Sequence, residues 1–161
     1  MKDLPLLIRN LWTNSEILAR FIEAIPQDRL FVQRRPGLWT IAEHVQHLAD
    51  TQSMLLGRIR AFEKESEPNF IPFIPKDDEV RTEAKTIDIE DALQCFTRFR
   101  GDQVELLNQI DASVWDKAAS HPEYEQYSLY ILVRHILMHD HWHMYRMEEL
   151  WLTRDEYLTE L

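Results

Sequence analysis

The sequence predicts an all-α protein, a four-helix bundle, and three observations support this fold class. The chain has 161 residues, of which 45% are hydrophobic and 29% charged, which is typical of one globular domain covering residues 1–161. Only three residues are glycine, whereas a β-sandwich or barrel of this length needs many tight turns and usually more glycine. Four long segments carry apolar residues at the three- and four-residue spacing of an amphipathic helix.

The first two helices have clear boundaries in the sequence. The first covers about residues 3–24, and Pro26 ends it because the residue before a proline disfavours helical geometry. The second begins at Thr40, which forms a capping box with Glu43, and it ends near Glu65.

A proline-containing connection covers residues 66–86, after the second helix. Its large apolar side chains would be costly to expose, so we expect the segment to lie across the bundle. Pro72 argues against a β-strand here, because proline cannot donate a hydrogen bond to a sheet. The expected apolar anchors are Phe70, Ile71, Phe73 and Ile74.

The last two helices also carry start signals. The third begins near Asp88, where acidic residues suit the positive N-terminal end of a helix, and extends to about Ile110. Ser128 caps the fourth helix, which runs to about Leu152. Residues 153–156 are typical of the start of a short C-terminal helix. These elements predict a four-helix bundle with a long second crossover.

Charge and cysteine content narrow the classes of partner. The formal net charge is −10 and the basic residues are scattered, which disfavours binding to nucleic acid or to anionic lipid. Cys95 is the single cysteine, so no intrachain disulfide can form. We find neither a signal peptide nor an apolar stretch of about 20 residues, and therefore expect a cytoplasmic protein that does not enter a membrane.

Histidines dominate the chemistry of the fourth helix. His135, His139 and His143 recur every fourth residue, which places them on one helical face, and His141 lies between them. His139 and His143 occupy positions of the apolar seam where leucine or isoleucine is usual. Buried neutral imidazoles need partners for their nitrogens. A transition metal ion bound by both rings would be such a partner, and carboxylates that hydrogen-bond to the rings would be an alternative.

A second group of histidines lies in the second helix. His44 falls near the centre of its apolar stripe and His47 on the flank, so periodicity alone favours His44 as the inward residue. Asp50, one turn after His47, is a candidate to orient its ring, whereas Asp140 points elsewhere on its helix than His139.

Several other types of site are excluded by spacing. A di-iron bundle needs paired Glu-x-x-His motifs, and these are absent from the sequence. The metalloprotease H-E-x-x-H, the nucleophile elbow, the P-loop and the dinucleotide fingerprint are absent as well. Arg134, Arg146 and His141 could line a mouth for an anionic substrate, but solvated helix faces explain them equally well.

Two stretches resemble the DinB/YfiT-like family of metal-binding bundles. The sequence from Gly37 to Asp50, GLWTIAEHVQHLAD, is similar to the family's second-helix signature, and HDHWH at residues 139–143 is similar to its late H-x3-H. By this resemblance the metal ligands are His47, His139 and His143, which favours His47 over His44. Many members follow the last histidine with Arg-Gly-Gln, but this chain has Met-Tyr-Arg-Met at residues 144–147, so substrate cannot be transferred.

The resemblance implies a bundle with up-down-down-up connectivity, a divalent ion such as zinc or nickel, and a homodimer. Some members of the family transfer low-molecular-weight thiols. We therefore expect a metal-dependent enzyme that activates a thiol or water for attack on a small electrophilic molecule. The competing hypothesis is a non-catalytic, stress-related binding protein whose histidines are structural. Three protein ligands favour the enzyme, since catalytic sites keep one coordination position open.

Overall fold

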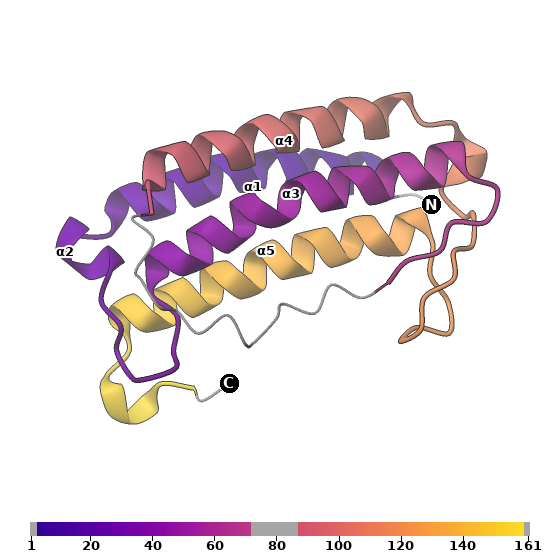
Figure 1. Ribbon diagram of the computed structural model, residues 1–161. Helices are drawn as coiled ribbons and strands as arrows, with labels where there is room; N and C mark the ends of the chain where they lie inside the picture. The colour runs from indigo at the N-terminus through magenta and orange to yellow at the C-terminus, as the bar shows by residue number, and fades with distance from the viewer. Residues whose placement is uncertain (1–2, 72–86, 160–161) are drawn as a thin grey trace.

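The computed structural model describes residues 3–71 and 87–159 and has the predicted architecture of four long helices (Figure 1). Their observed ends agree closely with the boundaries expected from the sequence. They are α1 (Leu4–Ala24), α3 (Ile41–Lys64), α4 (Ile89–Gln109) and α5 (Leu129–Leu152).

Three shorter helices complete the described chain. The predicted C-terminal helix is confirmed as a single 3-10 turn, η2 (Asp155–Tyr157). The sequence did not predict α2 (Gln27–Leu30), which directly follows Pro26, or the 3-10 turn η1 (Ala112–Val114). Both are about one turn long, which is too short to produce an apolar periodicity.

The four long helices pack as a bundle in which α1 and α3 each contact both α4 and α5. In Figure 1, α1 and α5 run in one direction, and α3 and α4 run in the other, which is the expected up-down-down-up connectivity. The end of α3 and the start of α4 therefore lie at opposite ends of the bundle, as a long crossover requires. In the described part of the chain, no helix is long and apolar enough to cross a bilayer.

The capping signals in the sequence are satisfied as predicted. The Thr40 hydroxyl accepts a hydrogen bond from the Glu43 amide at 3.1 Å, and the Glu43 carboxylate accepts one from the Thr40 amide at 2.6 Å. The Ser128 hydroxyl accepts from the Ile131 amide at the start of α5. These bonds satisfy amides that the first helical turn leaves without partners, and so fix where α3 and α5 begin.

The prediction of apolar anchors after α3 is correct for Phe70 and wrong for Ile71. Phe70 is buried against the rings of Phe62 and Tyr127, and its amide donates to the Ser120 carbonyl. Ile71 is 80% exposed, so its side chain does not pack against the bundle. The other two expected anchors, at positions 73 and 74, lie outside the described residues. Residues 69 and 120 form an isolated bridge, so the segment up to residue 71 has no strand, as Pro72 suggested.

A buried ion pair occupies the centre of the bundle. Arg100 of α4 and Asp140 of α5 are 0% and 1% exposed, and their charged atoms lie 2.9 Å apart. Arg100 also donates to the Gln52 side chain, and the Asn14 side-chain amide donates to Asp140. Asp140 therefore points into the core and away from the histidine face of α5, as the helical wheel indicates. All four long helices contribute to this polar network.

Arg34 joins the loop before α3 to the end of α5. Its guanidinium donates to the carbonyls of Leu150 and Thr153 at 2.5 and 2.8 Å, and pairs with Asp155 at 2.6 Å. The last carbonyls of a helix lack intrahelical partners, so Arg34 acts as a cap for α5. The same loop carries Trp39, whose ring stacks on His143 of α5.

Candidate metal centre

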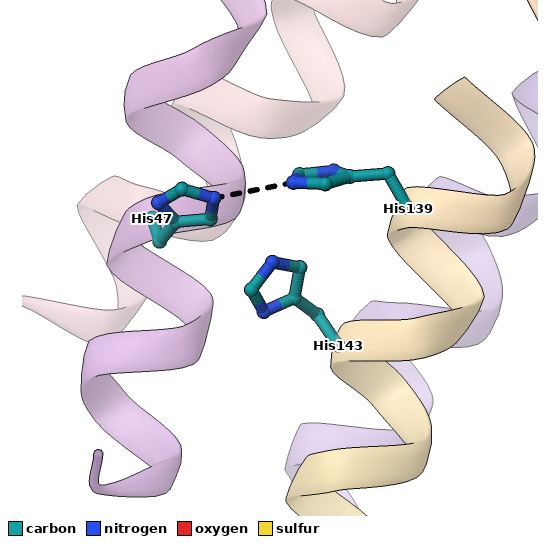
Figure 2. Close-up of side chains that lie close together, drawn as sticks. All are labelled: His47, His139 and His143. Carbon is teal, nitrogen blue, oxygen red and sulfur yellow. Dashed lines mark hydrogen bonds between the residues drawn. The ribbon is translucent and has the colours of Figure 1, made fainter. Parts of the chain in front are cut away.

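Three histidines from α3 and α5 converge at the interface of these helices. His47 projects from α3, and His139 and His143 project from successive turns of α5 (Figure 2). One ring nitrogen of each lies within 4.8 Å of the other two. The Nε2 atoms of His47 and His139 are 3.2 Å apart, and one nitrogen of His143 is turned toward the gap between them.

The spacing of these nitrogens fits a metal ion. Two imidazole nitrogens that bind one tetrahedral ion at about 2.0–2.1 Å lie roughly 3.3 Å from each other. The observed 3.2 Å between His47 and His139 matches this separation. Among the described residues, Nδ1 of His139 is buried without a hydrogen-bond partner, while Nε2 of the same ring faces Nε2 of His47. Imidazole nitrogens are softer ligands than the oxygen atoms that magnesium and calcium prefer. The three histidines therefore suit zinc or nickel better.

His44, the residue that periodicity favoured, lies next to the cluster and contacts His143. It is 4% exposed, and its Nδ1 lies 2.8 Å from Nδ1 of His143. Since this bond uses Nδ1 of His143, Nε2 is the nitrogen left for an ion. His44 and His47 therefore both face α5, where they contact His143 and His139 respectively.

Trp39 forms an aromatic wall on one side of the cluster. Its ring lies 5.1 Å from the rings of His44 and His47, and it stacks on His143 at 6.0 Å with an angle of 17°. Tryptophan removes much of the surrounding water, which strengthens electrostatic interactions at the site.

Burial keeps the four imidazoles in their neutral form. Loss of hydration lowers the pKa of His143 to about 2 and that of His44 to about 3. The same cause lowers the pKa of His47 and His139 to about 4. Neighbouring positive groups, the other imidazoles and Arg146 among them, add to these shifts. Neutral imidazole is the form that binds a metal ion, so the cluster is prepared for one at neutral pH.

These shifts predict acid sensitivity of the metal-free protein. Between pH 6.5 and the lowered pKa values, the unfolded chain binds more protons at these histidines than the folded chain, so stability falls as pH falls. One fully shifted histidine contributes up to about 1.4 kcal/mol per pH unit in this range. Urea unfolding of metal-free protein from pH 7 to pH 4 measures the slope. His143→Leu should make it shallower, and an unchanged slope would contradict the prediction.

The other residues singled out in the sequence lie apart from the three-histidine cluster. Asp50 is exposed and accepts from the Gln46 side chain, so it influences His47 only through its charge. The Arg146 guanidinium is buried and pairs with Glu149. His141 bonds to the Asn14 side chain.

The suggested mouth for an anionic substrate is therefore wrong for Arg146, which points into the protein. Arg134 is exposed and lies over the Tyr130 ring, which agrees with the alternative of a solvated helix face. His135 lies outside the three-histidine cluster but lines, together with His47 and His139, a cavity of about 410 Å³. The cation in the wall of this cavity is Arg58, which the sequence analysis missed.

Comparison with known proteins agrees with the four-helix bundle seen here. The chain matches the family model of the DinB superfamily over residues 12–152. It is similar to the solved structure of YfiT from Bacillus subtilis, described as a probable metal-dependent hydrolase with an unusual four-helix bundle topology. The TM-score is 0.81 at 23% sequence identity, over 93% of this chain and 86% of YfiT. No curated protein matches the chain in sequence.

Proposed function

Because this chain belongs to the DinB superfamily, we propose that it is a metal-dependent enzyme acting on a small molecule. His47, His139 and His143 hold a divalent ion, zinc or nickel, and the nucleophile is a water molecule or a low-molecular-weight thiol. The observation that carries this proposal is the 3.2 Å separation of Nε2 atoms on helices that are distant in sequence. The description of YfiT as a probable metal-dependent hydrolase supports the same class of chemistry.

The protein's own groups have defined tasks in this proposal. When bound, a divalent ion supplies Lewis acidity, which lowers the pKa of a coordinated water or thiol toward neutrality. His47, His139 and His143 would provide three ligands to such an ion, and His47 and His139 also line the neighbouring cavity, from which a substrate could approach. Trp39 stacks on His143 and limits the access of water to that ring. Substrate enters through the cavity, where its body is held and its electrophilic atom is directed toward the histidines.

Metal analysis of protein purified without a His-tag or chelating column tests the proposal. We expect about one equivalent of zinc or nickel per chain, or uptake of one equivalent on titration. Metal below about a tenth of an equivalent, with no uptake of added zinc or nickel, would leave the histidines as structural groups that bond to each other. His47→Ala should reduce stoichiometric uptake, because two remaining ligands bind a divalent ion much more weakly than three.

We expect His44 to strengthen metal binding by orienting His143. A neutral His143 that binds through Nε2 carries its proton on Nδ1 and donates it to Nδ1 of His44. His44→Leu removes this acceptor and should weaken metal affinity about 10- to 100-fold. His44→Asn keeps an acceptor oxygen and should retain most of the affinity. Competition with a chromophoric chelator measures the constants, and equal affinities for His44→Leu and the wild type would contradict this role.

The proposal extends to a homodimer that uses the outer face of α5. Met138, Trp142 and Tyr145 are 56%, 46% and 64% exposed and lie on one helical stripe. A contiguous apolar stripe of this kind is typical of a protein contact. Sedimentation velocity of the wild type should show a dimer that Tyr145→Glu dissociates, and a monomeric wild type at micromolar concentration would contradict it.

A further inference from the structure

The cavity beside the three histidines is an elongated groove between α3 and α5. Residues on one face of α3 line one wall, beginning at His47 and continuing through Thr51 and Leu55 to Arg58. Residues on the facing turns of α5 line the other wall. The loop before α5 closes the far end with aromatic side chains. The groove therefore has the metal cluster at one end and Arg58 at the other.

The two ends of the groove are three helical turns apart. His47 and Arg58 are separated by 11 positions, which at 1.5 Å per residue corresponds to about 16 Å between their backbones. Both side chains reach into the same cavity of about 410 Å³. A molecule that occupies it can contact both ends only if it is extended.

Arg58 is held in place by uncharged groups. Its Nη2 atom donates to the Ile71 carbonyl at 2.9 Å, and its guanidinium lies 5.7 Å from the centre of the Phe70 ring. Within residues 3–71 and 87–159, the observed ion pairs leave Arg58 without a carboxylate partner. A guanidinium has five N–H donors, so a half-buried Arg58 fixed in this way can still bind an anion.

Apolar and aromatic side chains line the groove between the histidines and the loop that closes its far end. Met54, Leu55, Leu132 and Ile136 supply aliphatic surface. The Tyr124, Tyr127 and His135 rings lie 4.9–5.6 Å from one another, at tilts of 38–51°, and form an aromatic wall. These surfaces suit an apolar or aromatic segment, since rings gain from stacked and tilted contacts.

We propose that the substrate is an elongated organic anion, with an apolar or aromatic body and a carboxylate or similar group that binds Arg58. This inference rests on the proposed function for the reacting end, which lies at the three histidines. Its anionic end depends only on Arg58 and can be tested on its own. Glu123 is exposed on the same cavity wall, and its solvated charge opposes anion binding weakly.

Phenylbutanoate and its uncharged analogue phenylbutanamide test the anionic end on metal-free protein. Titration calorimetry should show that the carboxylate binds at least about tenfold more tightly than the amide, as for a charge-assisted hydrogen bond. Arg58→Gln should abolish this preference, and Arg58→Lys should retain part of it. Arg60→Gln is the matched control, because Arg60 is exposed on α3 and does not line the groove. Glu123→Gln should strengthen binding of the carboxylate.

Mercaptohexanoate and hexanoate then test the reacting end. Loading the protein with zinc should strengthen binding of the thiol acid and leave that of hexanoate unchanged. If the carboxylate preference depends on Arg58 but zinc does not strengthen binding of the thiol acid, the result would contradict the proposed metal function and support the anion site. Equal binding of carboxylate and amide, a preference that survives Arg58→Gln, or no binding of phenylbutanoate at millimolar concentration would overturn the inference. Circular dichroism confirms that each variant is folded.

Discussion

Zinc-saturated wild-type protein is expected to melt about 10 °C above the metal-free protein, and His139→Ala is expected to lose this difference. A ligand that binds only the folded state at about 1,000 times its dissociation constant adds about 4 kcal/mol to the free energy of unfolding. For a chain of this size, 1 kcal/mol shifts the melting temperature by about 2–4 °C. His139 contributes the nitrogen that lies 3.2 Å from His47, so the variant has an incomplete set of ligands.

Differential scanning calorimetry with and without a chelator measures this effect. His135→Ala is the matched control, since it removes the same side chain one turn earlier on α5 and outside the three-histidine cluster. It should keep the full difference between the two states. If chelator lowered the melting temperature of His139→Ala as much as that of the wild type, His139 would not be a ligand. Equal melting temperatures of wild type in both states would argue for structural histidines.

Asp140→Leu is expected to destabilise the protein by about 3–5 kcal/mol. The change removes the partner of Arg100, which is 0% exposed and retains its charge in the core. An isolated buried charge is costly, because the interior cannot replace the hydration that the group had in the unfolded chain. The change also removes hydrogen bonds that join α5 to α1 and α4.

Urea unfolding gives the free energy for this variant and its controls. The double variant Arg100→Leu/Asp140→Leu removes both charges and should recover most of the lost stability. Asp50→Ala removes an exposed carboxylate from α3 and should change stability by less than about 0.5 kcal/mol. A loss below about 1 kcal/mol for Asp140→Leu would show that Arg100 finds another partner or water.

Helix boundaries could be predicted from the sequence because they depend on local chemistry. Thr40, Glu43 and Ser128 satisfy backbone amides within the same turn, so their positions in the chain are sufficient to identify helix starts. The single-turn helices could not be predicted, since they depend on how the chain docks onto the bundle. Ile71 shows the same limit, because the hydrophobicity of a residue alone does not indicate whether its side chain packs against the bundle.

The histidine cluster was only partly predictable. The seam position of His139 and His143 follows from periodicity, but the choice between His44 and His47 required a resemblance to a family. The structure places both close to α5, one bonded to His143 and one to His139. Whether the cluster binds a metal ion stays a prediction for the experiments above.

Residues whose roles depend on distant partners were missed. Arg100 and Asp140 are 40 positions apart, and the sequence around either residue does not indicate that the two charges meet in the core. Arg58 had a detectable signal, since it continues the face of α3 that begins with His47, Thr51 and Leu55. This pattern indicates a shared groove only once α5 is known to lie opposite that face of α3.

The Arg34 contact with the end of α5 has a consequence for the order of folding. It joins positions separated by 116–121 residues, and the His47–His139 contact joins positions separated by 92. Contacts of such long range form late, because closing a long loop costs chain entropy before any contact compensates for it. The two halves of the cluster therefore meet only when nearly the whole polypeptide is in place. Ion capture by this protein would accordingly report completed folding, and incomplete chains during synthesis would have no assembled pocket with which to sequester metal.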